Sequence, residues 1–146
     1  MGPARDAETS QAGVGPLLSV DIEPGVPASV VVPVRGLVQS LGNLVRNAME
    51  AGGPVDAVRL RVRTVAERVH FDVEDSGVGI PQETLARVGE PFFSTKAPGK
   101  GMGLGLFLAH AFAERWRGRL ALESEPGRGT RASLELPLRL EASDAR

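Results

Sequence analysis

The stretch from Val34 to Ala51 carries apolar residues at the spacing of an amphipathic helix. These residues are Leu37, Leu41, Leu44, Val45 and Ala48. Pro33 suits the start of this helix, because the first turn does not need the N–H that proline lacks. The following Gly52-Gly53-Pro54 is typical of a helix end. The pattern predicts one helix, with its apolar side turned toward a core.

Two further helices are predicted nearer the C-terminus. A short one runs from Pro81 to Val88 and opens with proline. A longer one spans Leu104 to Trp116, with an apolar set made of Phe107, Leu108, Ala111 and Phe112. The glycine-containing segment 89–103 between them is predicted to be a loop.

Alternating patterns predict the strands. In 58–65, apolar Val58, Leu60 and Val62 alternate with Arg59, Arg61 and Arg63. Val69, Phe71 and Val73 alternate in the same way, and residues 66–68 make the turn of a hairpin. The arginines would then line one face of a half-buried strand, and that face is expected to be solvated.

Shorter β-prone runs complete the sheet. Residues 17–22 and 29–32 are separated by the breaker Pro24-Gly25-Val26-Pro27. Runs 119–124 and 130–136 form a closing hairpin around 125–129. The sum is an α+β fold: a two-layer sandwich with a mixed, mostly antiparallel sheet of about five strands and three helices on one face.

Composition limits the range of functions. The chain has 146 residues, 42% of them hydrophobic, which suits one domain with a core. We expect a flexible lead-in over 1–16, a domain over 17–140 and a polar tail over 141–146. The absence of cysteine excludes disulfides and thiolate catalysis. A net charge of -1 gives no reason to expect nucleic-acid or direct membrane contact. A cytoplasmic location fits, including as part of a membrane-anchored parent.

Asn43 and Asn47 lie one helical turn apart, so their side chains share a face. Mg²⁺ prefers oxygen ligands and keeps several waters and phosphate oxygens. A carboxamide oxygen is such a ligand, and it adds no negative charge beside a triphosphate.

Asp75-Ser76-Gly77-Val78-Gly79 follows a predicted strand. A buried carboxylate at Asp75 would accept a hydrogen bond from the amino group of adenine and reject the carbonyl of guanine. Gly77 and Gly79 allow a tight turn and a close approach to the base. The alternative is an ordinary Asp-Ser-Gly β-turn.

A second glycine cluster, at Gly101, Gly103 and Gly105, lies beside the predicted start of the last helix. Backbone N–H groups at a helix start form an anion site, and glycines let phosphates come close. Lys96 and Lys100 flank this cluster and could reach phosphates. No Gly-Lys-Ser/Thr follows, so this is not a P-loop.

The four elements together, with Glu90-Pro91-Phe92-Phe93 between the glycine clusters, resemble the catalytic ATP-binding domain of bacterial two-component sensor histidine kinases. That domain belongs to the gyrase, chaperone, histidine kinase and mismatch-repair ATPase superfamily, with the Bergerat-type fold. The resemblance covers about residues 17–137. Phe92 and Phe93 could equally pack in the core or face a partner.

The resemblance implies a set of roles for residues of an ATP site. Asn47 would bind Mg²⁺, with Asn43 helping directly or through water, and Lys96 would act with them in catalysis. Asp75 would bind adenine, and the Thr130 hydroxyl would support the adenine pocket. The nucleotide-binding set implied is Asn47, Asp75, Gly77, Gly79, Lys96, Lys100, Gly101, Gly103, Leu104, Gly105, Leu106 and Thr130.

The residue at position 43 indicates the type of reaction. In gyrase-type relatives the corresponding residue is a glutamate that activates water, whereas an amide cannot act as a general base. We therefore expect transfer of the γ-phosphoryl group of ATP to a histidine on a separate dimerisation helix pair, with a response regulator as indirect partner. His70 and His110 lack the sequence context of a phosphoacceptor, so the chain alone is expected to be inactive.

Two other functions remain open from the sequence. One is a serine kinase of the anti-sigma-factor type, whose acceptor is a serine of a partner protein. The other is a nucleotide-binding interaction module without turnover.

Overall fold

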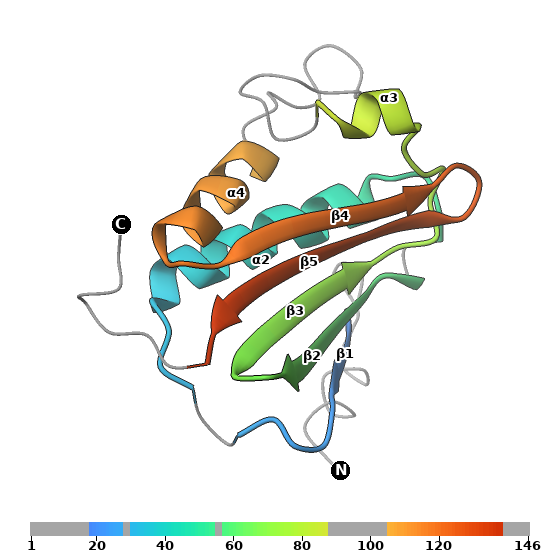
Figure 1. Cartoon of the computed structure of the whole chain (residues 1–146). Helices are drawn as coiled ribbons and strands as arrows, with labels where there is room; N and C mark the ends of the chain where they lie inside the picture. Colours follow the sequence, from blue (N-terminus) through green and yellow to red (C-terminus); the bar gives the residue numbers. More distant parts are fainter. Residues whose placement is uncertain (1–17, 28–29, 55–56, 88–104, 139–146) are drawn as a thin grey trace.

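The computed structural model describes residues 18–27, 30–54, 57–87 and 105–138 (Figure 1). The elements are β1 (Ser19–Ile22), α2 (Val34–Met49), β2 (Arg59–Val65), β3 (Arg68–Glu74), α3 (Gln82–Leu85), α4 (Gly105–Arg115), β4 (Arg119–Glu125) and β5 (Gly129–Pro137). The predicted lead-in over 1–16, the tail over 141–146 and the loop over 89–103 lie outside these residues.

The strands form one five-stranded sheet in the order β1-β2-β3-β5-β4. β1 pairs with β2 in parallel, and every other pair is antiparallel. The predicted mixed, mostly antiparallel sheet is confirmed. The run over 29–32 is different from prediction: Val31 makes only an isolated bridge, and Ser29 lies outside the described residues.

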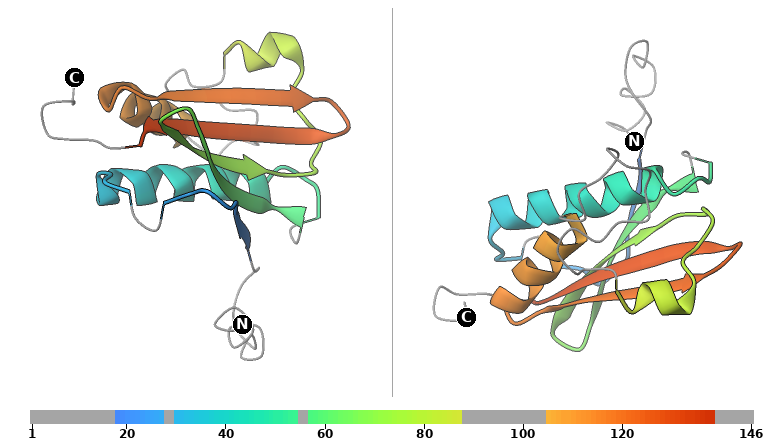
Figure 2. Two further views of the ribbon diagram at one scale, coloured as in Figure 1. Left: turned by 60° about the horizontal axis from the view of Figure 1, so that its bottom comes forward. Right: turned by 90° about the horizontal axis from the view of Figure 1, so that it is seen from above.

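Helices α2 and α4 pack side by side on one face of the sheet, giving two layers (Figure 2). Leu44 and Ala48 of α2 and Ala109 and Ala113 of α4 are buried in the interface. The strands contribute Val69, Phe71, Val73, Ala132, Leu134 and Leu136 to the core, and Val58, just before β2, completes it. The α+β sandwich is thus the fold predicted, with α3 as a single turn beyond β3.

The buried face of α4 differs from the predicted one. Leu108 is 43% exposed and Ala111 is also exposed, whereas Ala109 and Ala113 have no exposed surface. Small side chains let the helix lie close to the sheet, so alanines occupy the positions that the larger residues were expected to fill. The same close packing explains Gly36 of α2, where a Cβ would collide with the ring of Phe112.

Helix α4 ends in a Schellman motif, in which the chain after the helix turns back on its last carbonyls. The N–H of Gly118 donates to the carbonyl of Ala113 at 2.7 Å, and that of Arg117 to Glu114 at 3.2 Å. Arg117 takes a φ of 63°, the left-handed conformation that glycine adopts most easily. Gly118 itself lies against β5, because a Cβ there would collide with the carbonyl oxygen of Glu135.

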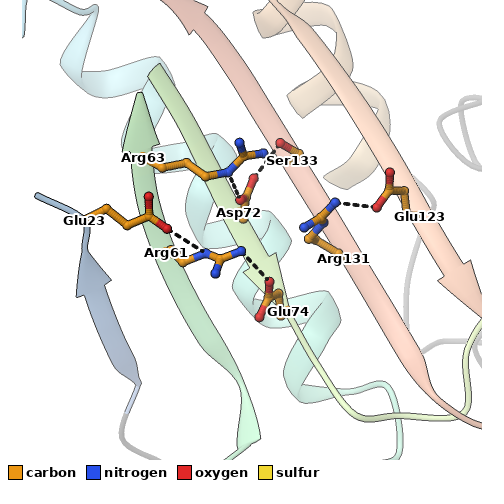
Figure 3. A network of polar contacts seen from close by, with 8 residues as sticks. All are labelled: Glu23, Arg61, Arg63, Asp72, Glu74, Glu123, Arg131 and Ser133. Carbon is orange, nitrogen blue, oxygen red and sulfur yellow. Dashed lines mark hydrogen bonds and ion pairs between the residues drawn. The ribbon is translucent and has the colours of Figure 1, made fainter. Parts of the chain in front are cut away.

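The sheet face opposite α2 and α4 carries a network of ion pairs across four strands (Figure 3). Nε of Arg63 lies 2.6 Å from Asp72 Oδ2, and the Ser133 hydroxyl donates to Asp72 Oδ1 at 2.6 Å. Arg61 lies 3.6 Å from Glu74, and Arg131 lies 2.5 Å from Glu123. This face is polar, as the arginine alternation predicted.

It was also predicted to be solvated, and at its centre that is wrong, because Asp72 is 0% exposed. Burial is the largest influence on the pKa of this carboxyl and acts to raise it. The hydrogen bonds from Arg63 and Ser133, with the positive charge of Arg63, outweigh burial and hold the pKa below its ordinary value. Asp72 is therefore a buried, paired carboxylate.

Candidate nucleotide site

The loop after β3 is organised by the side chain of Asp75. Its Oδ1 accepts a hydrogen bond from the N–H of Gly77 at 2.8 Å, and its own N–H donates to the carbonyl of Thr130 at 3.0 Å. Burial raises the pKa of the Asp75 carboxyl above its ordinary value, while hydrogen bonds with backbone groups of Gly77 and Thr130 oppose that rise. Asp75 thus has the geometry of the β-turn, and its carboxylate is half-buried.

The loop after β3 lies between two other segments: the residues that follow α2 and the β4–β5 turn. The N–H of Val78 donates to the carbonyl of Ala51 at 3.1 Å, and the N–H of Gly127 donates to the carbonyl of Val78 at 2.8 Å. The loop is therefore held by backbone hydrogen bonds on both sides.

Glycines allow this close meeting of backbones. A Cβ on Gly77 would collide with the carbonyl of Ala51, and one on Gly79 would collide with that of Glu125. Gly79 also has a φ of 79°, which supports the tight turn predicted for it. The space that the absent side chain of Gly77 leaves is filled by Ala51, two residues after α2 ends.

A cluster of hydroxyl groups lies beside the loop, on the helix side of the sheet. Ser124 Oγ accepts from the N–H of Ile80 at 2.8 Å, donates to the carbonyl of Gly129 at 3.0 Å, and lies 2.7 Å from Thr130 Oγ1. Thr130 was predicted as a site residue from the sequence, and Ser124 was not. The signal was present, because Ser124 continues the inward-facing alternation of Leu120 and Leu122 with a polar residue.

Asn43 joins the two helices. Its Nδ2 donates to the carbonyl of Gly105, the first residue of α4, at 3.3 Å. Its Oδ1 accepts from Arg46 at 3.2 Å. Asn47, one turn further along α2, is half-buried. The structure thus brings the asparagine helix to the start of the helix that follows the second glycine cluster.

A hollow of about 390 Å³ lies at this end of the sheet, where β3, β4 and β5 meet. Asp75, Ser124 and Thr130 line it together with the charged residues Glu74, Glu123, Glu125, Arg128 and Arg131. Of the adenine hypothesis, Asp75 and Thr130 border this hollow. Its residues Glu74, Glu123 and Arg131 take part in the ion pairs on the sheet face opposite the helices.

The remaining predicted residues divide into two groups. Leu106 packs against the hydrophobic core at the start of α4. Lys96, Lys100, Gly101, Gly103 and Leu104 lie outside the described residues, as do Phe92 and Phe93. Within the described part of the chain, no group of three histidine or acidic side chains could hold a metal ion.

The two histidines lie in different settings. His70 of β3 is half-buried, and its pKa is lowered by burial and then by the charge of Arg63. His110 of α4 is exposed, with Nε2 at 3.4 Å from Glu114. None of the described helices is long and apolar enough to span a lipid bilayer.

The sheet, the two paired helices and the glycine-containing loop after β3 together form an ATPase-type fold. Comparison with known proteins identifies the ATPase family to which the chain belongs. A family model described as histidine kinase-, DNA gyrase B-, and HSP90-like ATPase matches residues 33–140. The chain belongs to this family, and it corresponds to the catalytic ATP-binding domain of sensor histidine kinases.

Relatives support this placement. The chain is 46% identical over 102 residues to the sensor protein kinase FleS of Pseudomonas aeruginosa, covering 70% of this chain and 25% of FleS. It is 38% identical over 112 residues to the sensor kinase CckA of Brucella abortus, covering 68% of this chain and 12% of CckA. The chain therefore spans a quarter or less of the length of these two relatives.

A solved structure agrees with both. Full-length ShkA, crystallised in complex with AMPPNP, superposes with a TM-score of 0.71 at 26% identity, over 88% of this chain and 27% of ShkA.

Proposed function

We propose that this chain binds Mg-ATP and donates the γ-phosphoryl group to a histidine on a separate dimerisation helix pair of a two-component sensor kinase. The contact that best supports this is the hydrogen bond from Asn43 to the carbonyl of Gly105. It holds the helix with the candidate metal ligand against the N-terminal end of α4, where a helix dipole favours phosphate.

Asp75 is the proposed adenine ligand. Its carboxylate has backbone hydrogen bonds with Gly77 and Thr130, and the lone pairs left over would accept from the exocyclic amino group of adenine. Guanine presents a carbonyl at that edge, and two acceptors facing each other would disfavour it.

The carboxamide of Asn47 is the proposed metal ligand. When bound with the nucleotide, Mg²⁺ supplies positive charge that neutralises the phosphates and orients the γ-phosphoryl group. Asn43 would assist through water, because its oxygen already accepts from Arg46 and its nitrogen donates to Gly105. Lys96 and Lys100 are proposed phosphate contacts, and Lys96 is also placed in the catalytic set with the two asparagines.

Asn43 also favours phosphoryl transfer over hydrolysis. An amide has no proton-accepting basicity near neutral pH, so it cannot activate water as a glutamate would. Transfer requires an acceptor in line with the γ-phosphate: a bond from an imidazole nitrogen to phosphorus forms while the bond to the β–γ bridging oxygen breaks, leaving ADP. The proposed acceptor is a histidine outside this chain, which makes the isolated chain inactive.

The test supplies γ-labelled ATP, Mg²⁺ and a histidine-bearing dimerisation domain from the parent kinase. Acid-labile label is expected on that histidine, and Asn47→Ala should abolish it while leaving much of the adenine binding intact. Gln39→Ala, an exposed change on the same helix, is the matched control.

Other outcomes favour other functions. Acid-labile label on His70 or His110 of the isolated chain would contradict the proposal. Acid-stable label on a partner's serine would favour a serine kinase of the anti-sigma-factor type. Tight ATP binding without transfer to any acceptor would favour an interaction module without turnover.

A further inference from the structure

We infer that Ser124 is a positioning residue for base selection: it orients the Thr130 hydroxyl so that only acceptor lone pairs face the nucleotide. The ligand class selected is a purine with an amino group at position 6, over one with a carbonyl there. This inference rests on the proposed binding of ATP and adds a residue and a physical cause to its selectivity.

The direction of the hydrogen bond between the two hydroxyls follows from counting protons. Ser124 has one hydroxyl proton, and the carbonyl of Gly129, 3.0 Å away, can only accept it. One lone pair of Ser124 is used by the N–H of Ile80 at 2.8 Å. At 2.7 Å, Thr130 and Ser124 are close enough to require a proton between them, and only Thr130 has one left to give.

Thr130 therefore donates to Ser124, and Ser124 makes its full complement of one donated and two accepted hydrogen bonds. The Thr130 hydroxyl is left with lone pairs and no proton for a third partner. The group is half-buried and lies on the helix side of the sheet, in the same alternation as Ala132.

Asp75 lies opposite Thr130 at the end of the neighbouring strand β3. Its N–H donates to the carbonyl of Thr130 at 3.0 Å, and backbone hydrogen bonds with Gly77 and Thr130 act on its carboxyl. Asp75 and Thr130 thus present acceptors from two neighbouring strands. An exocyclic amino group offers two hydrogens to such a pair, directly or through a bridging water, whereas a carbonyl offers none.

Removal of Ser124's hydroxyl should change selectivity as well as stability. In Ser124→Ala, Thr130 loses the acceptor that holds its proton, so the hydroxyl is free to rotate and donate to a ligand carbonyl. A 6-oxo purine then gains a donor, and the preference for the 6-amino purine falls.

The experiment measures the Kd of ATP and of inosine triphosphate, which replaces the 6-amino group by a carbonyl, by calorimetry with Mg²⁺. Ser124→Ala should lower the ratio of the two affinities by about three- to tenfold, the effect of one net hydrogen bond. Ser124→Thr, which keeps the hydroxyl, should retain the wild-type ratio. Ser133→Ala removes a hydroxyl from the opposite face of the sheet, and it too should leave the ratio unchanged.

A double variant tests whether Ser124 acts through Thr130. In a Thr130→Val background there is no hydroxyl to orient, so adding Ser124→Ala should leave the ratio where Thr130→Val sets it. If Ser124→Ala fails to fold, Ser124→Cys replaces it, because a thiol is a weak acceptor of similar size and should lower the ratio in the same direction.

Two kinds of failure are distinguishable. If the wild-type chain binds neither nucleotide, the proposed function fails. If it prefers ATP and the ratio is unchanged in Ser124→Ala or Ser124→Cys, or falls further when Ser124→Ala is added to Thr130→Val, the inference about Ser124 is wrong while ATP binding stands.

Discussion

The carboxylate of Asp72 is fully buried and lies 2.6 Å from Nε of Arg63, on the sheet face opposite the helices. Removal of one partner of such a pair leaves the other charge buried without compensation. Arg63→Met should therefore lower the free energy of unfolding by about 2–4 kcal/mol, toward the lower part of the range for broken buried pairs because Ser133 still donates to Asp72. Chemical unfolding at pH 7 measures this.

Arg59→Met is the matched control, because Arg59 lies on the same strand and is exposed. Its cost should stay within about 0.5 kcal/mol. Equal effects of the two substitutions would show that the Arg63–Asp72 pair does not stabilise the sheet.

The pKa of Asp72 also predicts a dependence on acid. Since this pKa is lowered in the folded state, the unfolded chain binds protons first as the pH falls. The stability that Asp72 contributes is present above the pKa of an unfolded aspartate, about pH 4, and is lost as the pH falls toward the folded value. Asp72→Asn should flatten the acid side of the stability curve, whereas Asp21→Asn, on the exposed edge strand, should preserve its slope.

Asp75 should behave in the opposite way, because its pKa is raised in the folded state. The folded chain then holds this proton to higher pH than the unfolded chain, so stability falls as the pH rises from about 4 through the folded pKa. Asp75→Asn keeps an acceptor for the N–H of Gly77 and removes the half-buried charge. It should raise Tm at pH 7 while weakening ATP binding by about 1.5–3 kcal/mol.

Thermal unfolding and ATP titration of the same Asp75→Asn preparation separate the two effects. A lower Tm with unchanged ATP affinity would contradict both the burial argument and the adenine role.

Arg117 predicts a stabilising substitution. It adopts the left-handed conformation at the end of α4, which costs an L-residue about 1–2 kcal/mol and glycine little. Arg117→Gly should raise the free energy of unfolding by about 0.5–1 kcal/mol, after allowance for the greater freedom of glycine in the unfolded chain. Gly118→Ala should destabilise, because its Cβ would collide with β5. The two variants compared by chemical unfolding should differ in sign.

Periodicity predicted the fold well, because alternation in β2, β3 and β5 and helical spacing in α2 reflect a single buried face. Periodicity predicted burial less well on the outer face of the sheet, which is not apolar. Asp72 is an outward-facing polar residue in the sequence pattern, and only the register that places Arg63 and Ser133 around it explains its burial. In α4 the pattern favoured large residues, while the close contact is made by Ala109 and Ala113.

The candidate site could also be predicted only in part, because local patterns are visible in the sequence and contacts between distant residues are not. Asp75 and Gly79 are recognisable from local turn chemistry, which the structure displays. The alternation of β4 places Ser124 on the inward face, but its hydrogen bonds to Ile80 and Gly129 are seen only in the structure. Whether Asn43, Asn47 and Thr130 bind nucleotide and metal stays a prediction.

The meeting of the Asp75 loop with the β4–β5 turn has a consequence for synthesis. The carbonyl of Val78 accepts a hydrogen bond from Gly127, and the N–H of Ile80 donates to Ser124. Residues that are synthesised early therefore find these hydrogen-bond partners only in residues that are synthesised later. A nascent chain stalled on the ribosome with only the residues before Ser124 exposed would have α2, β2 and β3, and the loop would have Ala51 as a partner but not Ser124 or Gly127. Domains tend to fold as units during translation. Nucleotide should therefore begin to protect the emerging chain from proteolysis only after the β4–β5 turn has left the exit tunnel.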